Sequence, residues 1–334
     1  MWRLISAVAV SAAMLALLLF RFDACPQPMN ILEYIRTYGL RFFGSPSPFQ
    51  VTFLGASTLL FEDASQALLI DGFFTRPNVS FSNTTVTPNE TAIDDALEAA
   101  HITTTAVTRT LSLVGVVVNH SHYDHAMDSS VVADRTGALL VGSETTANIA
   151  RGRMFPEAQI RVINGGENFC VGRFRVSPVR TGHVPLPFGL DNPGDITTPT
   201  APATVGDYKG GGTFAIFVQY SGRGRTVMVQ GSAGFSPGAL QGRSATVAYL
   251  AVGGLSLFSN TAHRDAYWNE VVVVAPRRIV PIHWDSLSGP LTASIAPNDD
   301  GKAGIAFIEE RANMEGINFQ PPTIGTKVDP FAGL

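Results

Sequence analysis

The chain has 334 residues, of which 45% are hydrophobic and 15% are charged, enough for one large domain or two small ones. The formal net charge of −4 leaves no basic footprint for nucleic acid. Two cysteines, Cys25 and Cys170, are too few for a disulfide framework. We expect Cys170 to be a buried strand residue with a free thiol.

Residues 1–25 have the pattern of a secretory signal peptide or an N-terminal membrane anchor. Arg3 precedes an apolar run from Leu4 to Phe20 that only Ser6 and Ser11 interrupt. A signal-peptide cleavage site is poorly matched before Cys25, so lipidation at Cys25 and an uncleaved anchor both stay open. Each alternative predicts an extracytoplasmic protein, either periplasmic or secreted, with possible membrane association through its N-terminus.

Residues 26–48 read as a connector, and residues 49–334 as the main domain. Three strands are expected at residues 51–55, 58–62 and 67–71, separated by short turns. Asn78, Asn83 and Asn89 each begin an Asn-x-Ser/Thr sequon, which indicates an exposed loop. Helical spacing predicts a helix over residues 92–100.

A strand over residues 113–118 then leads into the segment His120-Ser121-His122-Tyr123-Asp124-His125. The chain has only seven histidines, and three of them fall within these six positions. Imidazole nitrogens and carboxylate oxygens are the ligands that suit zinc and similar divalent ions. A loop that leaves a strand can direct several such side chains to one point, so the segment predicts a metal site.

The elements after this segment alternate between helix and strand, the order of an α/β layered domain. Helices are expected at 129–135, 144–153, 265–273 and 303–315, and strands at 138–141, 172–179, 213–220, 225–230, 246–252 and 278–285. Two histidines, His183 and His283, follow or end such strands. The irregular stretch 184–212 begins at His183 and is interpreted as a lid or wall of the site, with Leu186, Phe188 and Leu190 as apolar substrate contacts. Its glycines, Gly210–Gly212, lack the Lys-Ser/Thr of a phosphate-binding loop.

The His-x-His-x-Asp-His pattern resembles the signature of the metallo-β-lactamase fold superfamily, in particular its lactonase-like members and metallo-hydrolases. The resemblance covers residues 49–331 and implies a four-layer αββα sandwich of the α/β class. It implies that His120, His122 and His183 hold one metal, and that Asp124, His125 and His283 hold a second or position a water. It also implies that Asp71 supports a ligand histidine and that Asp124 orients or deprotonates the attacking water.

The sequence departs from this family at Ser232, where the usual residue is an aspartate that bridges two metals. A neutral hydroxyl is a much poorer bridge, so either one or two Zn²⁺ ions are expected. Ser232 itself is expected to hydrogen-bond the water. Asp285, two residues after His283, is the candidate replacement for the missing bridge.

Three functions are compatible with these residues. The first is a metal-dependent hydrolase that uses activated water on an ester, lactone, amide or phosphodiester of a small-molecule or lipid-like substrate. The second is an iron-dependent oxidoreductase of the same fold. The third is a non-catalytic metal-binding protein, for which the lost bridging carboxylate is the argument.

Overall fold

The computed structural model describes residue 25 and residues 49–63, 65–102, 111–187, 191–220, 224–258, 261–291 and 295–334. The predicted targeting segment other than Cys25, the predicted connector, Phe188 and Leu190 lie outside these residues. Within the described part of the chain, no helix is long and apolar enough to cross a membrane.

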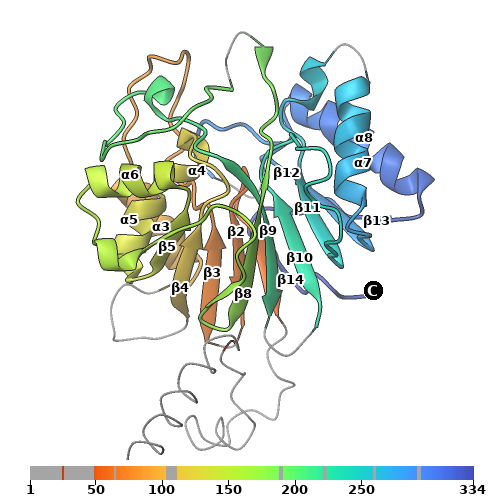
Figure 1. Cartoon of the computed structure of the whole chain (residues 1–334), viewed down its shortest axis with the longest axis horizontal. Helices are drawn as coiled ribbons and strands as arrows, with labels where there is room; N and C mark the ends of the chain where they lie inside the picture. The colour runs from red at the N-terminus through yellow and green to blue at the C-terminus, as the bar shows by residue number, and fades with distance from the viewer. Residues whose placement is uncertain are drawn as a thin grey trace, which may run out of the picture.

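Two mixed sheets of seven strands each form the centre of the molecule (Figure 1). The first has the order β14-β1-β2-β3-β4-β5-β6 and the second β13-β12-β11-β10-β9-β8-β7. The strands of the first sheet are β1 Gln50–Phe53, β2 Leu59–Glu62, β3 Gln66–Ile70, β4 Ser112–Val117, β5 Leu139–Gly142, β6 Ile160–Val162 and β14 Lys327–Val328. Those of the second are β7 Phe169–Val171, β8 Phe174–Thr181, β9 Thr213–Tyr220, β10 Thr226–Gln230, β11 Val247–Ala251, β12 Arg278–Ile282 and β13 Asn318–Phe319.

Helices cover the outer face of each sheet, which completes four layers (Figure 1). On the first sheet lie α3 Glu90–Ala99, α5 Ser129–Thr136 and α6 Glu144–Gly152, and on the second lie α7 Ala262–Val272 and α8 Asp299–Met314. The short α4 Tyr123–Ala126 and the 3-10 turns η1 Glu157–Gln159, η3 Val205–Asp207 and η4 Leu255–Leu257 complete the regular structure of the described residues. The predicted α/β sandwich is confirmed.

The sandwich forms because both faces of the central strands are apolar. Strands β9, β11 and β12 are buried along most or all of their length, as expected for strands covered on two sides. One apolar cluster fills the space between the sheets, with Phe61, Phe174 and Phe214 fully buried. A second cluster packs the helices against the first sheet through residues such as Ile93 and Leu97 of α3.

Several predicted boundaries differ from the structure by a few residues, and two of these differences have a clear local cause. The strand predicted over 278–285 ends at Ile282, because His283 adopts a left-handed backbone conformation with φ of 57°. The last helix begins at Asp299 instead of residue 303, because Asn298 caps it by accepting a hydrogen bond from Gly301 N. The three sequon asparagines are exposed as predicted, and Asn89 is also the N-cap of α3.

The prediction of a free thiol at position 170 is wrong. Cys170 lies in β7, as expected of a strand residue, but it is half-buried instead of buried and forms a disulfide with Cys25. A sulfur atom in a disulfide cannot also carry a lipid thioether, so this structure contradicts the lipidation alternative. The sequence separation of 145 residues is why no local pattern predicted the bond.

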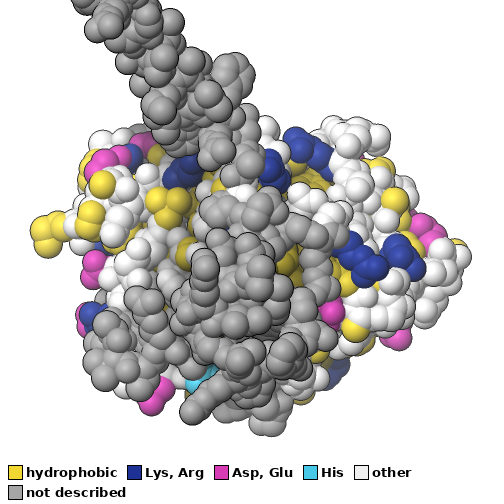
Figure 2. Space-filling view, turned by 90° about the horizontal axis from the view of Figure 1, so that it is seen from below, with side chains coloured by type: hydrophobic (Ala, Val, Ile, Leu, Met, Phe, Trp, Pro, Cys, Tyr) yellow, Lys and Arg dark blue, Asp and Glu magenta, His cyan; other side chains and the backbone are white. Residues whose placement is uncertain are grey.

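The end of the sandwich away from α4 is seen in Figure 2. Basic, acidic and apolar side chains are interspersed over its described surface, without one dominant kind. The clustered histidines and Asp124 lie elsewhere, at the ends of the strands beside α4.

Candidate metal centre

The predicted metal segment forms a tight turn between β4 and α4. Val118, Asn119 and His120 follow the end of β4 without regular secondary structure, and α4 begins after His122, its N-cap residue. This single helical turn places Asp124 and His125 one after the other beside His120. His120, Asp124 and His125 are all buried, so the turn directs its polar side chains inward.

The six predicted ligands form two neighbouring groups. His120, His122 and His183 offer one set of ligand atoms, and Asp124, His125 and His283 offer another; within each set the atoms lie within 4.8 Å of one another. The His120 and His125 rings, one from each group, are 3.8 Å apart between centroids. The fold therefore gathers residues from β4–α4, the end of β8 and the end of β12 at one point.

The chemistry of the first group suits a metal ion. Burial lowers the pKa of His120 well below its usual value, and burial likewise lowers that of His183 to about 3. Both rings are therefore neutral at pH 7 and have a lone pair to donate. Neither ring nitrogen of His120 has a hydrogen-bond partner among the described residues, although the side chain is buried. A buried polar atom without a partner is costly, and a coordinated ion removes that cost.

The second group is built around a carboxylate. Asp124 Oδ2 lies 3.1 Å from His283 Nε2 and 3.3 Å from His125 Nε2. Burial opposes ionisation of Asp124, but His125 and then His283 outweigh it and hold its pKa well below the usual range. For His125, burial favours the neutral form, yet Asp124 and Asp71 outweigh it and raise the pKa to about 10. A metal ion at this position would take the place of the His125 proton.

Asp71 orients the His125 ring through its Nδ1 atom. Its Oδ2 lies 2.8 Å from His125 Nδ1 and accepts hydrogen bonds from Ser57 Oγ at 2.5 Å and Asn119 Nδ2 at 2.9 Å. A carboxylate on Nδ1 fixes the ring with Nε2 facing the second group. The structure thus places Asp71 where the family resemblance implies.

A backbone carbonyl group orients the His183 ring. His183 Nδ1 donates to Val184 O at 2.7 Å, which leaves Nε2 as the ligand atom. Gly234 backs this residue: a Cβ added at Gly234 would lie 2.0 Å from the His183 carbonyl carbon. Only glycine permits the loop after β10 to approach His183 so closely.

Ser232 and Asp285 each have a hydrogen-bond partner outside the two ligand groups. Ser232 Oγ accepts a hydrogen bond from Val184 N at 3.0 Å. Asp285 belongs to neither ligand group; its carboxylate accepts from Ala56 N at 2.9 Å and pairs with Arg76 at 2.6 Å. The interpretation of Asp285 as a replacement bridge is therefore corrected, because Arg76 and the Ala56 amide already bind both of its oxygens.

Strained backbone surrounds the site. Four non-glycine residues, Ala56, Asp71, Arg76 and His283, have φ between 44° and 62°. Such conformations cost about 1–3 kcal/mol each and tend to cluster at functional sites. Sequence patterns did not identify Ala56 or Arg76, since neither belongs to a motif and their contacts join segments more than two hundred residues apart.

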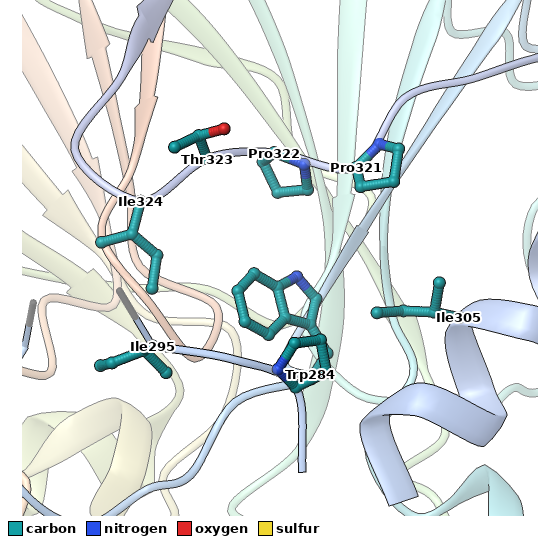
Figure 3. Close-up of a pocket in the computed structure, with 8 residues that line it drawn as sticks. Trp284, Ile295, Ile305, Pro321, Pro322, Thr323 and Ile324 are labelled. Carbon is teal, nitrogen blue, oxygen red and sulfur yellow. The ribbon is translucent and has the colours of Figure 1, made fainter. Parts of the chain in front are cut away.

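Of the three predicted substrate contacts, the structure describes only Leu186. It is partly buried and packs against the apolar cluster between the sheets, next to Gly254. A separate hollow of about 280 Å³ lies beside Trp284 (Figure 3). Its described lining is apolar apart from Thr323 and holds no titratable side chain, so it has no part in the metal chemistry.

A histidine- and aspartate-lined centre at one end of an αββα sandwich defines the metallo-β-lactamase class of folds. Residues 50–283 match the family model described as "Beta-lactamase superfamily domain", and the chain belongs to that superfamily. The match ends at His283 and so contains all six candidate ligands. A "UPF0173 metal-dependent hydrolase" from Pyrobaculum calidifontis is 32% identical over 124 residues, which are 37% of this chain. The chain spans about 45% of the length of that curated relative.

Solved structures show the same fold. Igni18, described as a metallo hydrolase from Ignicoccus hospitalis, has a TM-score of 0.52 and 15% identity, over 84% of this chain and 98% of its own. CmlA from Streptomyces venezuelae, described as a diiron β-hydroxylase, has a TM-score of 0.50 and 10% identity, over 85% of this chain and 54% of its own. At these identities the likeness concerns the fold alone.

Proposed function

We propose that the protein is a metal-dependent hydrolase of small-molecule or lipid-like esters, lactones, amides or phosphodiesters. The observation that carries the proposal is the convergence of five histidines and one aspartate in two adjoining groups. A divalent ion bound there supplies a Lewis acid and brings the pKa of water into the neutral range. The relative described as a metal-dependent hydrolase supports the same class of activity.

Each residue at the site has a separate proposed role. His120, His122 and His183 hold the first ion, and Asp124, His125 and His283 hold a second, with Zn²⁺ as the proposed metal. Asp124, ionised at neutral pH, orients the attacking water or accepts its proton. Leu186 contributes to an apolar wall beside His183, which favours an apolar group next to the scissile bond. Ser232 donates its hydroxyl proton toward the water, since its oxygen already accepts from Val184 N.

We also propose that the protein works outside the cytosol. The apolar run from Leu4 to Phe20 supports export, and the disulfide between Cys25 and Cys170 supports an oxidising compartment. Whether the first residues are removed or kept as a membrane anchor is tested by the N-terminal sequence of the exported protein.

The first experiment is elemental analysis of protein purified without added metal. We expect one or two zinc ions per chain in the wild type. The His122→Ala variant should keep its fold and lose most of the first ion, with hydrolysis of p-nitrophenyl esters, lactones and bis-p-nitrophenyl phosphate falling to background. Asn313→Ala, at an exposed position on α8, is the control for effects of mutation and purification that do not involve the site.

Each other result has a definite meaning. Iron in place of zinc, with oxygen-dependent turnover, would replace the proposal with the oxidoreductase. A protein that binds no metal, or that hydrolyses the probes equally well after chelation, would refute the metal-dependent mechanism. Metal without turnover of any probe class would favour the non-catalytic alternative.

A further inference from the structure

The irregular stretch beyond Leu186 reaches the metal loop. Ser121, between two ligand histidines, donates from its backbone N to Gly210 O at 2.8 Å. Gly211 has a φ of 68°, and a Cβ added there would lie 2.8 Å from Ser121 Oγ. The glycine run therefore allows the loop backbone to lie directly against the segment that carries His120 and His122.

One carbonyl group of this loop contacts a ligand ring. Asn192 O lies 3.3 Å from His122 Nε2, and the same oxygen accepts from Gly210 N at 3.1 Å. Because Nε2 donates to this carbonyl, the lone pair of the ring lies on Nδ1. His183 has the opposite arrangement, with Nδ1 bound to a carbonyl group and Nε2 left as the ligand atom.

The side chain of Asn192 is itself held in place. Its Nδ2 donates to Gly206 O at 3.0 Å and to Tyr208 O, and its Oδ1 accepts from Lys209 Nζ at 2.8 Å. Lys209 also donates to Gly206 O at 3.0 Å. The backbone of Asn192 has a φ of 35°, a left-handed conformation that asparagine tolerates and that is strained for most residues.

We propose that Asn192 is a positioning residue that holds His122 with Nδ1 toward the metal, and that Lys209 locks Asn192 in this position. The contacts of Asn192 with His122 and of Lys209 with Asn192 form the Asn192–Lys209 clamp. Through this clamp the loop slows release of the metal ion, in addition to forming a wall of the site. This inference rests on the proposed metal site, since it assigns a role in holding the first ion. The physical reason is that a hydrogen bond to the non-ligating nitrogen fixes both the tautomer and the orientation of a ligand imidazole.

The test compares zinc release from the full-length, zinc-loaded protein to a chromogenic chelator. Asn192→Ala and Lys209→Met should each release the first zinc ion about 10–100-fold faster than the wild type. Asn313→Ala and Lys302→Met, at exposed positions of α8, are matched controls and should release it at the wild-type rate. Nitrogen-15 spectra of the histidine rings supply a second measurement: wild-type His122 should show a protonated Nε2 and a metal-bound Nδ1.

The possible results separate clearly. Wild-type release rates in both clamp variants, or a metal-bound Nε2 in His122, would overturn the clamp while leaving the metal site intact. A wild-type protein that takes up no zinc would overturn the site and the clamp together. If Asn192→Ala fails to fold by circular dichroism, Lys209→Met and the wild-type ring spectrum still decide between these results.

Discussion

At the scale of single residues, Asp71 fixes the orientation of the candidate ligand His125 through a hydrogen bond to its Nδ1 atom. It binds His125 Nδ1 and is held by Ser57 and Asn119, so removing its charge should loosen His125. We expect Asp71→Asn to weaken zinc binding at the Asp124–His125–His283 group by about 10–100-fold and to leave the His120–His122–His183 group largely loaded. Chelator competition with two resolved steps measures this. Ser57→Ala, which removes one bond to Asp71, should have a smaller effect; equal loss from both groups would contradict the assignment.

The buried histidines also set a pH dependence for the metal-free protein. Burial lowers the pKa of His183 to about 3, below the 6.5 of the unfolded chain, so the unfolded state binds more protons between these values. This contribution to stability is fully present above pH 6.5 and is lost as the pH falls. At pH 5 His183 alone should cost about 2 kcal/mol of the free energy of unfolding. His125 acts in the opposite direction: its pKa is raised to about 10, so its contribution to stability grows as the pH falls towards 6.5 and offsets part of the loss there, and it changes little at lower pH.

Denaturant titrations of metal-free protein at pH 6.5, 6 and 5 test this dependence, because below pH 6.5 the loss from His183 exceeds the gain from His125. Stability that is constant or increases toward pH 5 would contradict the neutral, buried state of His183. The zinc-loaded protein should lose its metal over the same range, because protons compete with the ion for the ring nitrogens.

At the scale of elements, Asp285 joins the two sheets. It follows β12 of the second sheet and binds Ala56 and Arg76, which belong to turns of the first. The neighbouring His283 donates its backbone N to Ala56 O at 2.7 Å, so the same contact positions a candidate metal ligand. Asp285, interpreted from the sequence as a metal bridge, is therefore a structural link between the two sheets beside the site.

Breaking the Arg76–Asp285 ion pair should lower the free energy of unfolding. Asp285→Ala leaves Arg76 buried without a counter-charge, for which about 3–5 kcal/mol of stability is expected to be lost. Asp299→Ala, which breaks the exposed pair with Lys302 on α8, should change stability little. Urea unfolding of the two variants measures the contrast, and equal midpoints would show that the Arg76–Asp285 pair is not a stabilising link.

At the scale of the whole molecule, the disulfide connects the N-terminal region to the edge of the second sheet. Cys25 and Cys170 are separated by 145 residues, and the entropy lost on closing so long a loop raises the free energy of the unfolded chain by about 5 kcal/mol at 25 °C in the chain-entropy model. The Cys25→Ala/Cys170→Ala double variant should therefore unfold at a clearly lower denaturant concentration than the oxidised wild type. Thiol titration of the exported protein is the direct check: two free thiols would contradict the bond.

The sequence by itself determined the order of the longer elements and the residue types of the candidate metal centre, whereas the short strands β6, β7, β13 and β14 were not among the predicted strands. Alternation of apolar residues identified the long strands, and the spacing of His120, His122, Asp124 and His125 within one turn is local, so a local pattern was sufficient. The family resemblance added His183 and His283, whose positions at strand ends no periodicity alone would have marked as ligands.

Only the tertiary structure decided the contacts that bring distant segments together. Three contacts join residues 70 or more positions apart: the Cys25–Cys170 disulfide, the Asp285–Arg76 ion pair and the contact of Asn192 with His122. The left-handed backbone at Ala56, Arg76 and His283 is likewise imposed by packing and hydrogen bonding around the site and opposes local preference. Local sequence encodes which elements form, whereas the orientations of the candidate ligands His122, His125 and His183 depend on partners that only the folded chain supplies.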